Sequence, residues 1–225
     1  ALASLVGALL WLALMIAGMA SAGPLDTFDQ VVAYVSRLDA LFYAAYVNAA
    51  FLVTIPAILF MTALGRRCRS VSDSAVELGA AFIPIYGALN LVCYLSQITV
   101  VPMLVELRRA DGQQALADAL LRMMIHQWPS SAVAFFNALA YGLLGIPSII
   151  FGLALTKHDK PAKLGGVLLA LSGVASIVGV VGMLIHSKAL SLGVMIGGVL
   201  YVLALAALTD HFRRLARHPR PRASF

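Results

Sequence analysis

Amide and phenol side chains recur at helical intervals inside otherwise apolar stretches of the chain. Within residues 75–103, Tyr86, Asn90, Tyr94 and Gln97 follow one another at intervals of four, four and three residues. This spacing places all four side chains on one face of a helix. Polar side chains are costly inside a bilayer, so their positions point to a functional region.

Polar residues of the same kind occur in neighbouring apolar stretches. Asn137 and Tyr141 share a face of residues 129–156, and His186 ends the stretch 163–186. At about 1.5 Å per residue, these positions reach the same half of the helices as the first set, and we expect one pocket there. The candidate ligand-binding residues are Asn48, Tyr86, Asn90, Tyr94, Gln97, Asn137, Tyr141 and His186. The alternative is that these side chains only bond neighbouring helices to one another.

Two histidines, His126 and His186, are expected at the same face of the membrane. Together they could ligate a haem or a metal ion, or one of them could act as a general acid or base on a lipid. Interfacial histidines more often face head groups or water, so we expect no cofactor and favour a non-enzymatic role. Glu77 and Glu106 fall at the ends of their apolar stretch rather than at mid-depth, which disfavours proton-coupled transport.

The elements that must position these residues follow from composition. The 225 residues are 61% hydrophobic and 12% charged, with a mean hydropathy of +0.93. A soluble domain is about 45–50% apolar and about 25% charged, so a soluble enzyme is excluded. The apolar runs do not alternate as strands of a membrane barrel would. A membrane helix needs about 20 apolar residues. Six stretches qualify: 1–22, 40–65, 75–103, 129–156, 163–186 and 190–209.

The sequence therefore predicts an all-α, polytopic membrane bundle of six transmembrane helices, forming a single domain over residues 1–225. The first stretch ends in Ala20-Ser21-Ala22-Gly23, which resembles a signal-peptidase site. We interpret it as a retained helix, and expect the natural start to lie upstream of Ala1.

Basic residues sort to one side of this bundle. They gather in the second and fourth connections and in the C-terminal tail: Arg66, Arg67, Arg69, Lys157, Lys160, Lys163, Arg213, Arg214, Arg217, Arg220 and Arg222. The other connections mix fewer basic residues with acidic ones, so we expect both termini to be cytoplasmic. The formal charge of +6 then indicates contact with anionic lipid head groups at the basic tail, and not with nucleic acid.

The longest outer connection contains an amphipathic pattern over residues 113–128. Leu116, Leu120, Met124 and Trp128 recur every four residues, while the opposite face is polar and places Asp118 and Arg122 at pairing distance. We expect a helix in the outer interface, which either covers the bundle or forms a lid over a cavity. Residues 24–39 are expected to be a short and mildly acidic outer connection.

Prolines and small residues shape the predicted spans. Ile-Pro steps at Pro56, Pro84 and Pro147 predict bent helices with freed carbonyl groups. Pairs of small residues four apart predict close helix packing. These pairs are Ala13/Ala17, Ala175/Gly179 and Gly193/Gly197.

The order of these features resembles a known pattern. Apolar segments 38–69 and 74–97 enclose a basic turn, and Trp128 and the run KHDKPAKLGGV at 157–167 follow. From about residue 30 the chain resembles a bacterial six-helix integral-membrane family of unknown function, although the Trp usual in that family after the basic-proline turn is missing at 162–163. The resemblance implies a multi-pass protein of the bacterial cytoplasmic (inner) membrane, and implies no activity.

Three functions remain open on the sequence alone. The first is an outward-facing polar pocket that binds or transports a small amphipathic molecule. The second is a structural or accessory subunit, which would use an exposed small-residue groove such as Gly193/Gly197 to hold a membrane-protein partner. The third is a lipid-modifying enzyme that uses His126 or His186.

Overall fold

The computed structural model describes residues 1–69, 73–157 and 160–217, and every regular element in these ranges is helical. Six helical segments in this part of the chain are long and apolar enough to cross a membrane: Leu2–Ala22, Ala40–Cys68, Asp73–Arg109, Ala132–Leu155, Ala162–Leu184 and Lys188–Arg217. The predicted all-helical bundle with six membrane-spanning helices is confirmed. The orientation of the termini stays a prediction.

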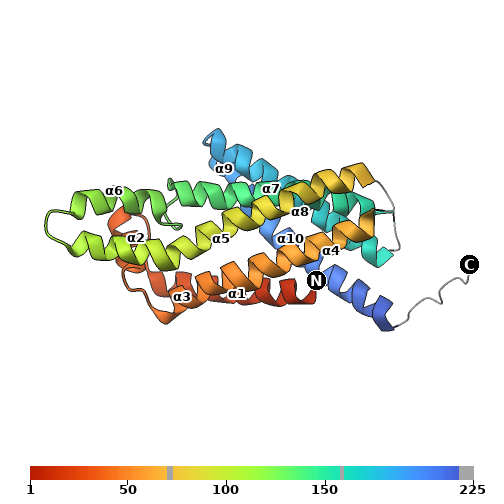
Figure 1. The fold of residues 1–225 in the computed structure, drawn as a ribbon, viewed down its shortest axis with the longest axis horizontal. Helices are drawn as coiled ribbons and strands as arrows, with labels where there is room; N and C mark the ends of the chain where they lie inside the picture. The colour runs from red at the N-terminus through yellow and green to blue at the C-terminus, as the bar shows by residue number, and fades with distance from the viewer. Residues whose placement is uncertain (70–72, 158–159, 218–225) are drawn as a thin grey trace, which may run out of the picture.

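The helices form an elongated bundle (Figure 1). One side consists of α1 (Leu2–Ala22) packed against a long composite helix, α3 (Ala40–Val47), η1 (Asn48–Thr54) and α4 (Ile55–Cys68). The helix α5 (Asp73–Arg109) crosses the bundle between this side and α7 (Ala132–Leu155). Buried apolar residues form two clusters along the molecule's length.

Glycines hold α7, α8 (Lys160–Leu184) and α10 (Gly193–Arg217) in backbone contact. A Cβ atom on Gly145 of α7 would lie 2.7 Å from the carbonyl oxygen of Gly173 in α8, and one on Gly193 would lie 2.5 Å from that of Ala175. Any larger side chain at these positions would separate the helices. Gly193 and Gly197 are buried against α8 of the same chain, so this pair offers no exposed groove to a partner.

Proline acts differently at its predicted positions. The helices α5 and α7 continue through Pro84 and Pro147, whereas the π-helix η1 ends two residues before Pro56, which lies in the first turn of α4. Pro56 has no N–H to bond the carbonyl of Leu52. Gly7 of α1 lies against that carbonyl so closely that a Cβ atom there would be 1.8 Å from the oxygen. Ser4 of α1 donates a hydrogen bond to the Pro56 carbonyl over 2.8 Å.

Two short helices cover the C-terminal end of α5. The helix α6 (Gln114–Met124) lies within the predicted amphipathic segment and packs antiparallel to α5. The helix α2 (Phe28–Val35) lies in the connection predicted to be short and mildly acidic, for which no helix was predicted. A capping box starts α2: Thr27 Oγ1 accepts the N–H of Gln30, and the Gln30 side chain accepts that of Thr27. The apolar face of α2 is short and turn-forming residues lie around it, so the sequence pattern did not indicate this helix.

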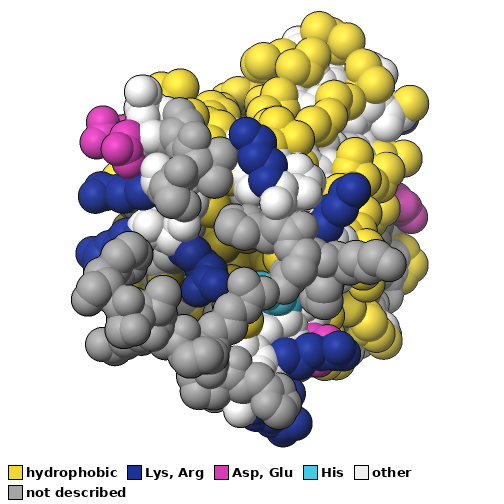
Figure 2. Space-filling view, turned by 90° about the vertical axis from the view of Figure 1, so that its right-hand side faces the viewer, with side chains coloured by type: hydrophobic (Ala, Val, Ile, Leu, Met, Phe, Trp, Pro, Cys, Tyr) yellow, Lys and Arg dark blue, Asp and Glu magenta, His cyan; other side chains and the backbone are white. Residues whose placement is uncertain are grey.

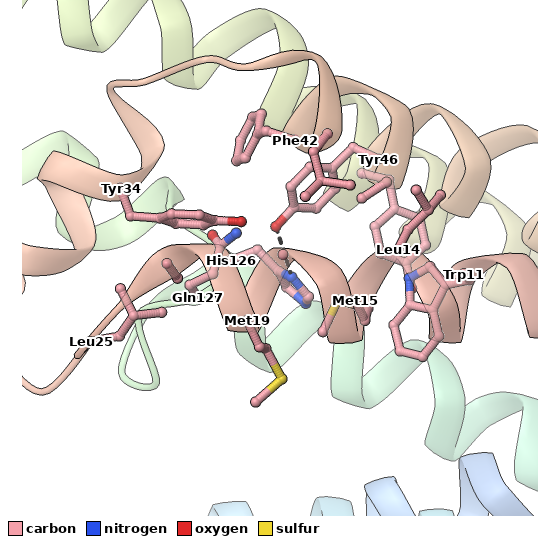
Figure 3. Close-up of a pocket in the computed structure, with 15 residues that line it drawn as sticks. Trp11, Leu14, Met15, Met19, Leu25, Tyr34, Phe42, Tyr46, His126 and Gln127 are labelled. Atoms are coloured by element: carbon pink, nitrogen blue, oxygen red, sulfur yellow. Dashed lines mark hydrogen bonds between the residues drawn. The ribbon is translucent and has the colours of Figure 1, made fainter.

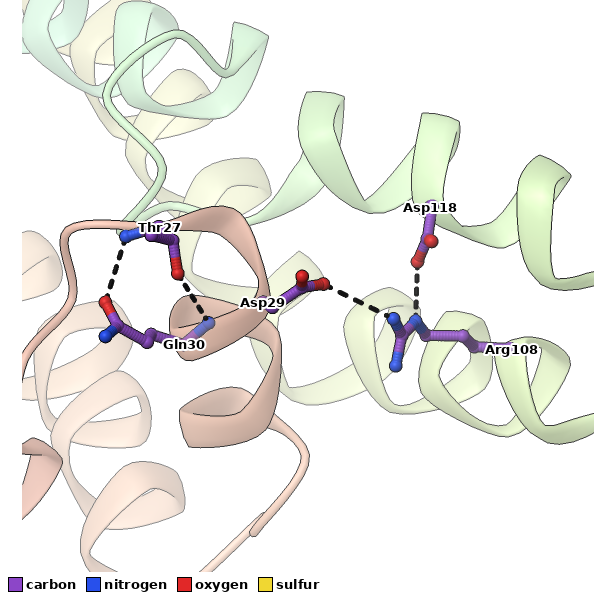
Figure 4. Close-up of polar contacts among 5 residues, drawn as sticks. All are labelled: Thr27, Asp29, Gln30, Arg108 and Asp118. Carbon is purple, nitrogen blue, oxygen red and sulfur yellow. Dashed lines mark hydrogen bonds and ion pairs between the residues drawn. The ribbon is translucent and has the colours of Figure 1, made fainter.

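The expected pairing of Asp118 with Arg122 is wrong. Figure 4 shows Arg108 of α5 between Asp118 of α6 and Asp29 of α2. Arg122 instead places its guanidinium 3.8 Å from the centre of the Phe28 ring. Asp118 and Arg122 therefore bind residues of neighbouring helices and not each other, because α2, α5 and α6 pack together at this end.

The opposite end of the bundle is basic. Figure 2 shows Lys and Arg side chains spread over this end, with few acidic side chains among those described. The exposed basic residues here are Arg66, Arg67, Arg69, Lys157, Lys163, Arg213, Arg214 and Arg217. The predicted tail residues Arg220 and Arg222 lie outside the described residues. The segregation of charge matches the pattern from which we expect this end to face the cytoplasm.

Candidate functional site

His126 is the centre of a hydrogen-bonded group at the end of the bundle that carries α2 and α6. It lies in the non-helical segment between α6 and α7. Its Nδ1 is 3.3 Å from the Tyr46 hydroxyl, and its Nε2 is 3.1 Å from Oδ1 of Asn137. Burial lowers the pKa of the imidazole, while the Asn137 hydrogen bond acts in the opposite direction. The ring is therefore neutral and fixed by a partner on each nitrogen.

Gln97 of α5 holds this segment in place. Its Nε2 donates to the carbonyl of Met124 over 2.8 Å, and its Oε1 accepts the N–H of His126 over 2.9 Å. A carboxamide can bond a backbone donor and a backbone acceptor at once, as a neighbouring strand would. These two bonds satisfy the carbonyl of the last residue of α6 and an N–H just beyond the helix, neither of which has a helical partner.

Four other predicted residues join this group between α5 and α7. Asn137 donates from Nδ2 to Oδ1 of Asn90 over 3.1 Å, and the hydroxyls of Tyr94 and Tyr141 are 2.8 Å apart. The ring of Tyr86 packs edge-on against Tyr141. The sequence stripes thus meet as expected, but as a closed hydrogen-bonded core between two helices and not as the wall of an open pocket.

A cavity of about 60 Å³ lies beside this core (Figure 3). It lies between α1, the segment from α2 to α3, and His126 with Gln127. Its lining residues are Trp11, Leu14, Met15, Gly18, Met19, Ala22, Leu25, Tyr34, Leu41, Phe42, Ala45, Tyr46, Tyr94, His126 and Gln127. Most of this lining is apolar, and none of these residues is an acid, a lysine or an arginine. Of the predicted ligand-binding residues only Tyr94 lines it.

Two predicted residues lie apart from the core and the cavity. Asn48 is buried in η1, where neither side-chain atom has a hydrogen-bond partner among the described residues. His186 is exposed in the turn between α8 and α9 (Lys188–Ser191), with a backbone φ of 56°. No group of three or more His, Cys, Asp or Glu side chains in the described ranges could hold a metal ion.

Several cavity residues were missed from the sequence. Trp11, Met15 and Met19 recur every four residues on α1, which was a usable signal for one helix face. The pattern did not predict a cavity lining, because aromatic and apolar residues in a membrane helix ordinarily face lipid. Tyr34 and Gln127 lie outside the predicted spans, and only the packing of α2 and of the segment after α6 brings them to the cavity.

Searches against family models, curated proteins and solved structures found no match to this chain. They therefore lend no support to the family resemblance seen in the sequence. Function has to be inferred from the cavity and its hydrogen-bonding groups.

Proposed function

We propose that this integral membrane protein binds a small, uncharged amphipathic molecule in the cavity beside His126. The observation that carries the proposal is the composition of the lining. An apolar wall from α1 faces polar atoms of Tyr34, Tyr46 and Gln127 at one end. Ligand sites are typically apolar with a few polar groups that fix orientation.

The size of the cavity suits one end of such a molecule. About 60 Å³ accommodates a head group of a few heavy atoms, and the rest of the ligand must extend beyond it. Met15 and Met19 border the cavity on α1, and Met19 is 68% exposed. Methionine side chains adapt their shape, so a single alkyl chain can pass between them towards the bilayer.

The lining also favours an uncharged head group. A charged group held away from water without a partner is strongly disfavoured. The cavity offers no side chain of opposite charge, because His126 is neutral and no Asp, Glu, Lys or Arg is among its lining residues.

Binding is better supported than transport. Tyr94, which lines the cavity, is 1% exposed and bonded to Tyr141. Behind it, Asn90 and Asn137 bond one another between α5 and α7. A passage through the bundle would have to break these bonds and leave buried amides unpaired.

Photolabelling tests the proposal directly. The purified protein, reconstituted in phosphatidylcholine vesicles, is irradiated with a diazirine-bearing dodecanol, and the labelled residues are located by mass spectrometry. We expect labels on residues 11–19 of α1 and 41–46 of α3. The variant Gly18→Leu should lose most of this label, because a Cβ atom on Gly18 already lies 3.3 Å from the Tyr34 hydroxyl.

Gly198→Leu is the matched control, since nothing lies within 4 Å of a Cβ atom there. It should label like the wild type. Labelling spread evenly over all lipid-facing helices, or unchanged in Gly18→Leu, would refute the cavity as a binding site.

A further inference from the structure

We infer that the cavity selects a head group that donates a hydrogen bond, so that its ligand is a long-chain alcohol and not an ether, ester or ketone. The inference rests on the proposed function and specifies the ligand of the same site. It follows from the direction of the hydrogen bonds that end at the cavity.

The direction is set inside the bundle. Asn137 uses its Nδ2 to donate to Asn90, so the atom it turns towards His126 is the carbonyl oxygen Oδ1. A carbonyl oxygen only accepts. Nε2 of His126 must therefore carry the ring proton, and Nδ1 of the neutral ring is left as an acceptor.

Tyr46 transmits this direction to the cavity. Its hydroxyl lies 3.3 Å from Nδ1 of His126, and since that nitrogen accepts, the hydroxyl must donate. A phenol has one proton, and Tyr46 donates it in the hydrogen bond to His126. The Tyr46 oxygen can therefore only accept from its other partner, the side chain of Gln127.

Gln127 then uses its Nε2 to donate to Tyr46 and keeps its Oε1 as the acceptor. Its Oε1 is buried and has no hydrogen-bond partner among the described residues. Figure 3 places the Gln127 side chain beside the hydroxyls of Tyr34 and Tyr46 at the polar end of the cavity. A buried acceptor without a partner destabilises the empty site, and a donor on the ligand relieves that cost.

A hydroxyl meets these requirements. It donates its proton to Oε1 of Gln127, and it accepts from the hydroxyl of Tyr34, whose proton can rotate towards it. Ethers, esters and ketones have no proton to give and leave Oε1 of Gln127 unpaired. An ammonium group donates, but no carboxylate lines the cavity to balance its charge.

Competition for the photolabel tests the inference. Dodecanol and dodecyl methyl ether, counted per mole of lipid because they partition differently, compete with the diazirine-bearing dodecanol in the same vesicles. For the wild type we expect dodecanol to compete about tenfold better, the effect of roughly one buried hydrogen bond. Equal competition by both compounds overturns the inference but leaves the proposed function intact.

Variants locate the source of the preference. Gln127→Met keeps the length of the side chain and removes the acceptor, so dodecanol should fall towards the level of the ether. Gln113→Met, at an exposed position before α6, should keep the full preference. A preference that persists in a folded Gln127→Met overturns the role of Gln127. Absence of any saturable label in the wild type instead refutes the proposed function, so the two failures differ. The wild-type comparison decides the inference even where the variant does not fold.

Discussion

The side chain of Gln97 accepts the backbone N–H of His126 over 2.9 Å while bonding the carbonyl of Met124 over 2.8 Å. One residue of α5 thus fixes the chain where α6 has ended and α7 has not begun. The position of the imidazole between Tyr46 and Asn137 depends on this anchor. Gln97 is therefore a positioning residue for the cavity, although it does not line it.

Gln97→Leu should destabilise the protein strongly. It leaves the His126 N–H and the Met124 carbonyl unpaired, at about 1–3 kcal/mol for each buried group. Thermal unfolding in detergent measures the loss. Thr99→Val is the control, because the exposed Thr99 hydroxyl bonds only Leu95 of its own helix and its loss should change stability by about 0.5 kcal/mol or less. Equal effects of the two substitutions would contradict the anchoring role.

Stability should fall in mild acid because of His126. Burial keeps its pKa below the ordinary 6.5 in the folded protein, whereas the unfolded chain regains that value. Below pH 6.5 the unfolded state therefore binds the proton first, and the free energy of unfolding decreases until the pH reaches the lowered folded pKa. Well above pH 6.5 both states are unprotonated, and the group contributes no pH dependence.

Unfolding measured between about pH 5 and 8 tests this dependence. His126→Gln should remove the part of the slope that lies below pH 6.5. His186→Gln should retain it, since His186 is exposed outside the cavity. If the slope is lost only in the His186 variant, the pH dependence comes from His186 and the prediction for His126 is wrong.

The success of sequence-based prediction here depends on how local each feature is. The six spans depend on runs of apolar residues, and the common face of Asn90, Tyr94 and Gln97 depends on spacing within one helix, so both were predictable. The cavity was not, because it forms where α1 packs beside α3 and where Gln127 follows α6. His186 does not lie with the other predicted residues, because α8 ends before it and His186 is in the turn that follows.

The contact between Gly7 and Leu52 should tolerate no side chain. A Cβ atom on Gly7 would lie 1.8 Å from the Leu52 carbonyl oxygen, so α1 would have to move away from η1. Gly7→Ala should cost at least about 1–3 kcal/mol, the usual range for overpacking. Thermal unfolding in detergent measures it against Gly198→Ala, whose added methyl group meets no atom within 4 Å. Similar stabilities of the two variants would show that α1 does not pack closely against η1.

The placement of charge predicts which end faces outwards. At the α6 end, Arg108 pairs with Asp118 and Arg109 with Glu106, so their charges are balanced. At the other end the exposed basic side chains greatly outnumber the acidic ones among those described. Because positive charge is retained on the cytoplasmic side, we expect the α6 end, with the cavity, to face outwards.

Cysteine labelling decides this orientation. The native thiols of Cys68 and Cys93 are 1% and 2% exposed, so they should not react in the folded protein. In intact bacterial cells, a membrane-impermeant maleimide should label Asp111→Cys, in the exposed turn before α6. It should label Arg213→Cys, near the end of α10, only after the membrane is permeabilised. The reverse pattern would place the basic end outside, and the cavity would then open towards the inner leaflet.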